Sequence, residues 1–446
     1  MTTTKNNEHK KLNFSSEREQ SQVCLNSAEH EKNQGRKVLN VPNLRFKEFQ
    51  GEWEKHELGD ICETITDFVA AGSFASLREN VKYYQEDNFA QLVRTVDLKK
   101  DFTNNDFVYV DEFAYDFLWR VQLKEPNIVL PNIGANIGEK YYVSTKDLPK
   151  EKNVLGPNAI LLRSKCNDTH FVYFRLSTSS YDNEMKKLVG ASGQPKFNKT
   201  DLKKVRLFMP SLKEQKKISY FLGLLEERIA TQNKIIEDLK KLKCAIIEKV
   251  LNNSSCDKLR LGDVGSYIRG LTYSSNDVVE CNGTLVMRSN NIVNGSSLDY
   301  TNNVVSVNKQ ISQEQQLQDG DIIICMANGS SALVGKSSFY DGKCSLPITV
   351  GAFCGIYRSK MPITKWLFQT NRYRRYIWNS LQGGNGAIAN LNSEDILRMS
   401  FPLPEKQTVE HCTKLLSSLE SLIESNVSLC SMFSQQKEYL LRQMFI

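Results

Sequence analysis

Several features that define common protein classes are missing from this 446-residue sequence. No apolar run approaches the roughly 18 residues that cross a bilayer, and the first 40 residues are polar and lack the apolar segment of a secretion signal. The eleven cysteines form no C-x-x-C pair, and the five histidines do not stand at metal-ligand spacing from them. We therefore expect a cytoplasmic protein with reduced thiols, no disulfide framework and no bound metal.

The sequence does contain a long internal repeat. When it is shifted by 194 positions, Arg94-Thr95 falls on Arg288-Ser289 and Asn198 falls on Asn392. This period exceeds the roughly 20 to 50 residues of solenoid units, so it indicates a duplicated domain followed by a helix. The predicted order is a disordered N-terminal extension (1–40), a first domain (41–210), a first long helix (211–252), a second domain (253–404) and a second long helix (405–446).

Each long helix carries a heptad pattern. The apolar positions of the first are Leu222, Leu225, Ile229, Ile236, Leu239, Ile246 and Val250, with Gln232 and Lys243 in the two polar slots. Adding 194 gives a second seam with its polar slots at the matching places, Asn426 and Lys437. Such a seam is typical of a coiled coil, and matched polar positions fix its register. The alternative is two unrelated amphipathic helices, each packed on its own domain.

The distance between the domains follows from the first helix. About 40 residues at ~1.5 Å each make a rod of about 60 Å. Only the short polar segment 252–257 separates its end from the second domain. The second helix must therefore run back along the first, which predicts an antiparallel pair with approximate two-fold symmetry and a domain at each end.

Positive charge is concentrated near the end of each domain, although the net charge is only +7. Between Gly342 and Ser393 there are seven Lys or Arg residues and no Asp or Glu. The matching region from Met185 to Arg206 holds seven basic residues and Asp201 alone as an acid. Neutralisation of nucleic-acid phosphates is the usual reason for such a concentration, and a solvated basic face is the alternative.

The domains themselves are predicted to be α+β, because short strand-like runs such as Ile128-Val129-Leu130 and Ile322-Ile323-Ile324 alternate with glycine-rich turns. Each domain closes with a glycine-containing loop, at 190–198 and 383–392. The predicted fold is two homologous mixed α/β domains joined by two long helices that form an antiparallel coiled coil.

A family resemblance rests on the order of several short motifs. Leu58-Gly59-Asp60 and Leu261-Gly262-Asp263 open the domains, and the Gly-rich loops end in Phe197-Asn198 and Leu391-Asn392. Met209-Pro210-Ser211-Leu212-Lys213-Glu214-Gln215 opens the first long helix, and the second copy has Phe401 to Gln407 there. In this order, over residues 41–446, the sequence resembles the specificity subunit of a type I restriction–modification system.

The resemblance implies a function without catalysis. Each domain would be a target recognition domain that reads one half of a bipartite, asymmetric DNA sequence, and the helices would set the spacer. Two modification subunits would dock on the chain and methylate adenine with S-adenosylmethionine, and two restriction subunits would add ATP- and Mg-dependent translocation and cleavage. The chain would bind none of these cofactors and would act in the bacterial cytoplasm.

Two other classes are weaker. A fused restriction–modification enzyme would need cofactor motifs, but the sequence has no Pro-Pro pair, and Ser330 to Ser337 lacks the leading glycine of a Walker A motif. An adaptor that joins two protein partners would explain the coiled coil but would leave the paired basic stretches without a role.

Candidate DNA contacts are polar residues beside glycines on loops, since Arg reads guanine and Asn or Gln reads adenine. In the first domain they are Arg94, Asn132, Asn136, Ser192, Gln194 and Lys196. In the second they are Arg288, Asn290, Asn291, Asn328, Ser330, Asn385 and Asn390, with Arg372, Arg374 and Arg375 as phosphate contacts. Each could instead be a turn-former or a cap. Partner subunits are expected on the exposed helix flanks around 216–227 and 409–420.

Overall fold

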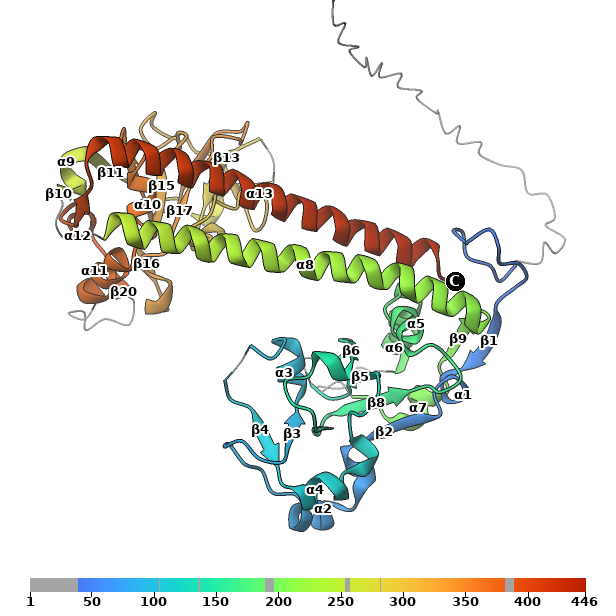
Figure 1. Cartoon of the computed structure of the whole chain (residues 1–446). Coiled ribbons are helices and arrows are strands. Elements are labelled where there is room, and N and C mark those ends of the chain that lie inside the picture. The colour runs from blue at the N-terminus through green and yellow to red at the C-terminus, as the bar shows by residue number, and fades with distance from the viewer. Residues whose placement is uncertain are drawn as a thin grey trace, which may run out of the picture.

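The computed structural model describes residues 39–103, 105–134, 137–188, 196–252, 257–280, 282–381 and 389–446. They form two mixed α/β heads and a rod of two long helices (Figure 1). Head 1 spans residues 54–209 and head 2 spans 257–403, and the rod consists of α8 (Leu212–Leu251) and α13 (Lys406–Gln443). The predicted N-terminal extension, up to residue 38, and the loops 189–195 and 382–388 lie outside the described residues.

The two helices of the rod are antiparallel. Lys243 on α8 pairs with Glu420 near the start of α13 (Nζ–Oε1 3.3 Å), whereas Lys437 near the end of α13 pairs with Glu226 (Nζ–Oε1 2.5 Å). Every seam position predicted from the heptads is buried or half-buried. The coiled coil is therefore confirmed, and the alternative of two separate amphipathic helices is wrong.

Head 1 contains short strands connected by short helices. Its strands are β1 (Glu54–Glu57), β2 (Thr64–Asp67), β3 (Ala90–Val93), β4 (Val108–Val110), β5 (Asn127–Pro131), β6 (Tyr141–Val143), β7 (Asn153–Leu155), β8 (Ala159–Arg163) and β9 (Arg206–Met209). Its helices are α1 (Leu58–Ile61), α2 (Phe74–Asn80), α3 (Thr95–Lys99), α4 (Glu112–Phe117), α5 (Thr169–Leu176), α6 (Ser179–Leu188) and α7 (Lys199–Lys203).

Head 2 is built in a similar way but with more strands and fewer helices among its described residues. Its strands are β10 (Asp257–Arg260), β11 (Gly265–Arg269), β12 (Val278–Val279), β13 (Thr284–Met287), β14 (Val305–Val307), β15 (Ile322–Cys325), β16 (Ala327–Asn328), β17 (Ser337–Phe339), β18 (Ile348–Val350), β19 (Cys354–Ser359), β20 (Ala389–Asn390) and β21 (Ser400–Leu403). Its helices are α9 (Leu261–Val264), α10 (Thr364–Leu367), α11 (Asn371–Leu381) and α12 (Ser393–Leu397).

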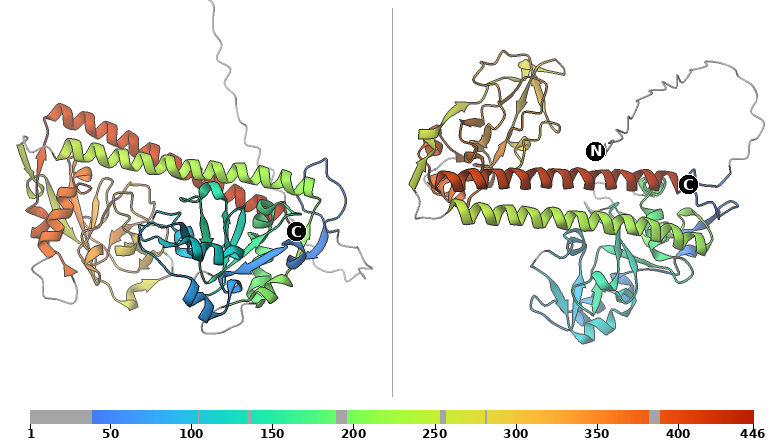
Figure 2. Two further views of the ribbon diagram at one scale, coloured as in Figure 1. Left: turned by 60° about the horizontal axis from the view of Figure 1, so that its bottom comes forward. Right: turned by 45° about the horizontal axis from the view of Figure 1, so that its top comes forward.

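The main sheets of the two heads have the same strand order. The four-stranded antiparallel sheet is β2-β8-β5-β6 in head 1 and β11-β19-β15-β17 in head 2. In each head a two-stranded ribbon, β1-β9 or β10-β21, joins the start of the domain to the strand before the next rod helix. In one view both heads lie on the same side of the rod, and in the other they lie on opposite edges (Figure 2), as an approximate two-fold axis across the rod requires.

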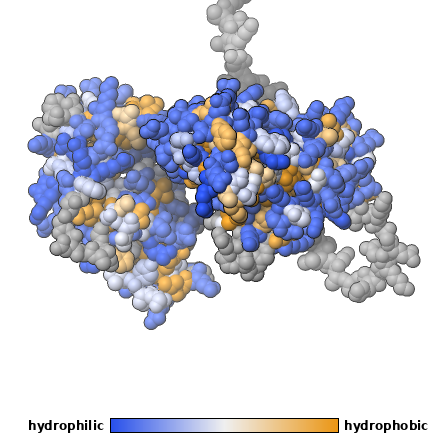
Figure 3. Space-filling model, turned by 90° about the horizontal axis from the view of Figure 1, so that it is seen from below, coloured by the Kyte–Doolittle hydropathy of each residue, from blue (hydrophilic) through white to orange (hydrophobic). Residues whose placement is uncertain are grey.

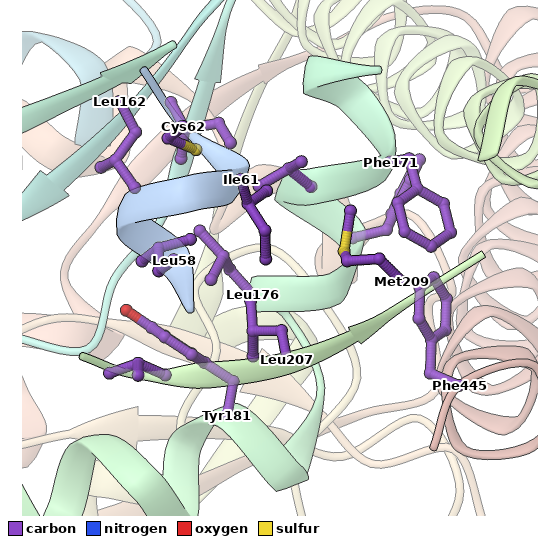
Figure 4. Packing of buried hydrophobic residues seen from close by; sticks show 14 of the residues in the cluster. Leu58, Ile61, Cys62, Leu162, Phe171, Leu176, Tyr181, Leu207, Met209 and Phe445 are labelled. Carbon is purple, nitrogen blue, oxygen red and sulfur yellow. The ribbon is translucent and has the colours of Figure 1, made fainter. Parts of the chain in front are cut away.

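The rod contributes to the core of each head. At head 1, Phe171 packs against Phe445 near the chain end, with ring centroids 5.3 Å apart (Figure 4). Trp53 packs against the same ring, with centroids 6.1 Å apart. In head 2, Ile247 and Leu251 from the end of α8 join the buried cluster. Full burial of each such side chain stabilises the fold by about 1.5–3 kcal/mol. Each head is thus fixed to one end of the rod.

Membrane spans, thiols and metal clusters can be examined in the residues that the structure describes. No helix in the described ranges is long and apolar enough to cross a membrane. The eight cysteines in this part of the chain are free thiols, of which Cys62, Cys325, Cys354 and Cys412 are buried. Burial raises the pKa of the Cys62 thiol to about 12, which keeps it protonated and unreactive. Among the residues that the structure describes, no cluster of His, Cys, Asp and Glu is placed to hold a metal ion.

Candidate nucleic-acid interface

Equivalent positions in the two heads can be assigned from the register of the main sheets. Asp67 on β2 pairs with Ile160, which pairs with Leu130 on β5. The same row in head 2 is Arg269 on β11, Gly355 on β19 and Ile324 on β15. Asp67 and Arg269 therefore occupy the same place in the two copies, at the end of their strands.

A hollow opens beside each of these positions. Hollow 1 has a volume of about 560 Å³ and is lined by Asp67, by Asn132 and Ile133 after β5, and by residues 157–159 at the start of β8. Hollow 2, of about 510 Å³, is lined by the matching segments of head 2. Those segments are Arg269 on β11, Met326 and Ala327 after β15, and Ala352 and Phe353 before β19. The repeat thus places a hollow at the same site in each head, with different side chains around it.

Each hollow also adjoins the glycine-containing loop of its head. Lys196, near the end of the loop in head 1, forms a β-bridge with Ile133 at hollow 1. Asn390, near the end of the loop in head 2, pairs with Ala327 and lines hollow 2. The predicted sites Asn136, Ser192, Gln194 and Asn385 lie outside the described residues. Each hollow therefore lies beside a loop that carries candidate DNA contacts.

Of the candidates in head 1, Asn132 and Lys196 lie at the hollow and Arg94 lies apart from it. The Nδ2 of Asn132 donates to the carbonyl of Phe197 (3.4 Å), and its Oδ1 is buried without a hydrogen bond. Lys196 is exposed. Arg94 precedes α3, and its guanidinium donates to both carboxylate oxygens of Asp97 (3.0 and 2.7 Å). Because the side chain of Asp97 is fully buried, Arg94 primarily holds this turn together.

In head 2, too, some candidates lie at or near the hollow and others lie apart from it. Asn390 and Ser330 are exposed, and Asn328 is half-buried, with its Nδ2 donating to Ser289 Oγ (3.2 Å) and its Oδ1 accepting from the Ser330 N–H (3.0 Å). Asn328 also pairs with Ala389 on β20, next to Asn390. These residues line the approach to hollow 2 from the side of the Gly-rich loop.

The neighbouring turn around residues 288–291 requires one correction. Arg288 and Asn290 are exposed, and the Arg288 Nη2 donates to the Asn303 carbonyl (3.0 Å). Asn291 is fully buried, donating to the Asn302 carbonyl (2.7 Å) and accepting from the Arg288 N–H (2.9 Å). It caps the turn and, being fully buried, cannot reach a base, so we remove it from the candidate set.

The three arginines of α11 face different surroundings. Arg372 is half-buried, with Nη1 3.5 Å from the Ser400 carbonyl and Nε buried without a hydrogen bond. Arg374 and Arg375 are exposed, as is the neighbouring Trp378. Only two of the predicted phosphate contacts therefore present their charge to solvent.

In the view from below, the heads form separate lobes with a mostly hydrophilic surface and small hydrophobic patches (Figure 3).

The sequence reasoning missed two arginines, Arg78 on α2 at hollow 1 and Arg269 at hollow 2. It also missed exposed aromatic side chains at the rims, namely Phe74, Tyr83 and Phe353, which are 76%, 52% and 68% exposed. None of these residues lies in the Gly-rich loops, and only Phe353 among them lies in a basic stretch, the one from Gly342 to Ser393. Their only sequence signal was position, at or near the ends of strands and short helices.

Charged side chains of the rod, which pair with each other across the two helices, also contact the heads. Lys243 is bonded to the Gly295 carbonyl of head 2 (2.8 Å) as well as to Glu420, and burial lowers the pKa of its ammonium group. At the matching place in head 1, Glu226 contacts Lys437 and His170. Burial opposes ionisation of Glu226, but the hydrogen bonds from these two partners lower its pKa. Each head is thus fixed in one orientation on the rod.

Comparisons with known proteins agree with this architecture. Residues 50–241 match the family model described as type I restriction modification DNA specificity domain. A putative type I restriction enzyme MjaX specificity subunit from Methanocaldococcus jannaschii is 24% identical over 415 residues, which cover 87% of this chain and 91% of the relative. The type I restriction enzyme EcoKI specificity subunit from Escherichia coli K12 is 29% identical over 171 residues, 35% of each chain.

A solved structure shares the fold. The crystal structure of the type I restriction–modification system S subunit from M. genitalium matches with a TM-score of 0.56 at 14% identity, covering 91% of this chain and 99% of that one. Specificity subunits of this family are non-catalytic DNA-recognition proteins. Residues 50–241 of this chain match their specificity domain, and over 87% of its length the chain is similar to a specificity subunit of a type I restriction enzyme.

Proposed function

We propose that each head reads one half of a bipartite, asymmetric DNA sequence and that the rod sets the unread spacer between the halves. The observation that carries the proposal is the pair of hollows at matched places with different linings. Two copies of one fold that bound the same ligand would keep the same side chains. Different side chains around a shared site are expected when the two heads read different base pairs.

The rod supports a fixed separation between the heads. Its helices contain 40 and 38 residues, and each end is built into the core of one head. At ~1.5 Å per residue, the longer helix spans about 60 Å. Because neither head can move without breaking a buried cluster, the spacer length would be a property of the rod.

Residues at the hollows and on their approaches are assigned to DNA as follows. Base contacts come from Asn132, Asn328, Ser330 and Asn390, together with Asn136, Ser192, Gln194 and Asn385 of the loops. Phosphate contacts come from Lys196, Arg288, Asn290, Arg374 and Arg375. Arg94 and Arg372 support these surfaces from within, since both make bonds inside their heads.

Partner subunits are assigned to the exposed apolar side chains of the rod. Phe221 and Leu415, which are 39% and 45% exposed, lie 194 positions apart at the two ends, and Ile235, Leu242 and Leu422 continue the row at heptad spacing. Large exposed apolar side chains in a row are typical of an interface. We propose that two modification subunits dock here, followed by restriction subunits, and that S-adenosylmethionine, ATP and Mg are bound by these partners.

The proposal is tested by sequencing methylated adenines in host DNA with and without this chain. We expect one split, asymmetric motif that disappears when the chain is absent. Exchanging residues 53–210 for the first head of another family member should change one half of the motif and leave the other half and the spacer intact. Changes in both halves would contradict the division of labour between the heads.

The competing adaptor hypothesis is tested by the salt dependence of binding. Because each phosphate contact releases about 0.9 counterion, the four cationic side chains assigned to phosphate should lower DNA affinity by about two orders of magnitude between 50 and 200 mM salt. A flat profile would favour an adaptor that binds two proteins.

A further inference from the structure

Arg269 has a free guanidinium at hollow 2. It is exposed, and within the described part of the chain its guanidinium makes no ion pair and no hydrogen bond. By contrast, Arg358 on the adjacent strand β19 donates to both carboxylate oxygens of Asp321 (2.8 and 2.6 Å). The charge of Arg269 is therefore not used to hold head 2 together.

The backbone that carries Arg269 is nevertheless held firmly. Arg269 pairs with Gly355 in the sheet, and its carbonyl accepts from the Gln315 side chain (3.2 Å). The next residue, Gly270, approaches the Gly351 carbonyl so closely that a Cβ would lie 2.2 Å from it. No other residue fits there without a backbone shift. A free cationic head on a fixed backbone is the arrangement expected of a preorganised contact.

Two other side chains face the same hollow. Phe353 is 68% exposed, although its carbonyl accepts from the N–H groups of Met326 (2.8 Å) and Ala327 (3.2 Å), so its backbone is also fixed. Asn390 enters from β20. An arginine, an aromatic ring and an amide around one hollow provide hydrogen-bond donors, an acceptor and an apolar surface, the groups that read base edges.

A comparison with the matched position in head 1 favours base reading over phosphate binding for Arg269. Asp67 stands where Arg269 stands in head 2, and its carboxylate is bonded to Lys199 (2.7 Å) and to the Ala70 N–H (3.0 Å). Phosphate lies along every DNA sequence, so a phosphate-binding position has no reason to carry a negative charge in one of the two heads. A position that carries opposite charges in the two copies is instead expected to follow the base sequence.

We infer that Arg269 reads a guanine in the half of the DNA target that head 2 contacts, donating two hydrogen bonds to O6 and N7 of that base. The inference rests on the proposed function of the heads. Bidentate contacts of this kind discriminate against the wrong base by roughly ten- to a hundredfold.

The test uses the full chain together with its modification partner in a host that lacks other adenine methylation. Methylated adenines are sequenced for the wild type, Arg269→Ala, Arg269→Lys and Arg269→Gln. In the Ala variant, one guanine position in one half of the motif should become degenerate, and the other half should stay unchanged. In the Gln variant the same position should shift toward adenine, since glutamine pairs with the adenine edge. Arg398→Ala, which removes an exposed arginine of the same head that pairs with Glu394 and lies outside hollow 2, should keep the wild-type motif.

Each outcome decides between the alternatives. An unchanged motif in all three Arg269 variants, or lower methylation at every site alike, would overturn the inference and leave the two-headed reading intact. A wild type without any split motif would overturn the proposed function itself. If Arg269→Ala fails to fold, the Lys and Gln variants decide, because a new preference for adenine cannot arise from instability.

Discussion

Gln232 donates a hydrogen bond through Nε2 to the Oδ1 of Asn426, the residue 194 positions further along the chain. This separation equals the period of the repeat, so each residue faces its own counterpart in the other copy. Because the helices are antiparallel, equivalent residues can face each other only where an approximate two-fold axis crosses the rod. The ion pairs Lys243–Glu420 and Lys437–Glu226 lie on either side of this axis and are exchanged by it.

The Gln232–Asn426 pair should contribute more to the register of the two helices than to the stability of the coiled coil. Gln232 is only 4% exposed, so Asn426→Leu leaves its amide without a partner and should destabilise the chain by about 1–3 kcal/mol. The double variant with Gln232→Leu should regain that stability but pair less selectively, because an apolar layer accepts other registers. Thermal unfolding and the mass in solution measure the two effects. A double variant that remains a strictly monomeric chain of wild-type stability would contradict a role in specificity.

The junction of head 2 with the rod should be more sensitive to charge removal than the junction of head 1. Glu420 balances both Lys243 and Lys365, and its side chain is 10% exposed, whereas that of Glu226 is 27% exposed. Glu420→Gln leaves two ammonium groups beside a neutral amide and should lower the free energy of unfolding by about 3 kcal/mol or more. Glu226→Gln, the matched control, should cost less because water reaches it. Thermal midpoints compare the two, and equal losses would contradict the argument.

The long-range plan of the fold was predictable from the sequence. The heptad patterns of α8 and α13, together with the short link after Leu251, predicted an antiparallel pair of helices, and the structure has this pair. The reason is that helix periodicity and chain length are local quantities. The strand order of the heads was not predictable, because strands of two to six residues pair through contacts far apart in sequence.

For the candidate site, the sequence indicated some of the lining residues but not which side chains are free to bind. Asn132, Lys196 and Asn390 lie at the hollows, as expected for residues beside Gly-rich loops. Asn291 has the same composition signal but is buried as a cap. Arg269 was missed because nothing local distinguishes an arginine that ends a strand at a hollow from one that ends it in solvent. Which polar group is free depends on tertiary partners that sequence spacing does not encode.

Acid should weaken head 1 through Glu63. This carboxylate accepts from the N–H groups of Lys165 (2.7 Å) and Cys166 (3.1 Å), and although its partial burial opposes ionisation, these bonds lower its pKa to about 2. A depressed folded-state pKa contributes stability that is present above the unfolded value of about 4.3 and is lost as pH falls toward 2. The thermal midpoint of the wild type should therefore drop more between about pH 4.5 and 2.5 than that of Glu63→Gln. Parallel curves for the two proteins would exclude this contribution.

Arg94 and Arg288 occupy matching positions but should respond differently to truncation. Arg94→Ala leaves the fully buried carboxylate of Asp97 without its guanidinium and should destabilise head 1 by about 2–3 kcal/mol. Arg288→Ala removes an exposed side chain bonded only to a carbonyl, so it should cost less than about 1 kcal/mol while weakening DNA binding. Thermal unfolding and DNA titration of both variants separate the roles. A stable Arg94→Ala protein with reduced affinity would reverse the assignment.

Arg374 and Arg375 should act on DNA through charge alone. Both are exposed on α11, and neither has an acidic partner among the described residues. Each contact with a phosphate releases about one counterion, so removing one should lower the slope of log affinity against log salt by about 0.9. Arg374→Ala and Arg375→Ala should each give this change with every DNA sequence, and the double variant should give about twice as much. Arg398→Ala, whose guanidinium pairs with Glu394, is the matched control and should leave the slope unchanged. A slope that stays constant in the double variant would show that α11 does not reach the DNA backbone, and the positive charge of this helix would then have to be explained by a partner protein.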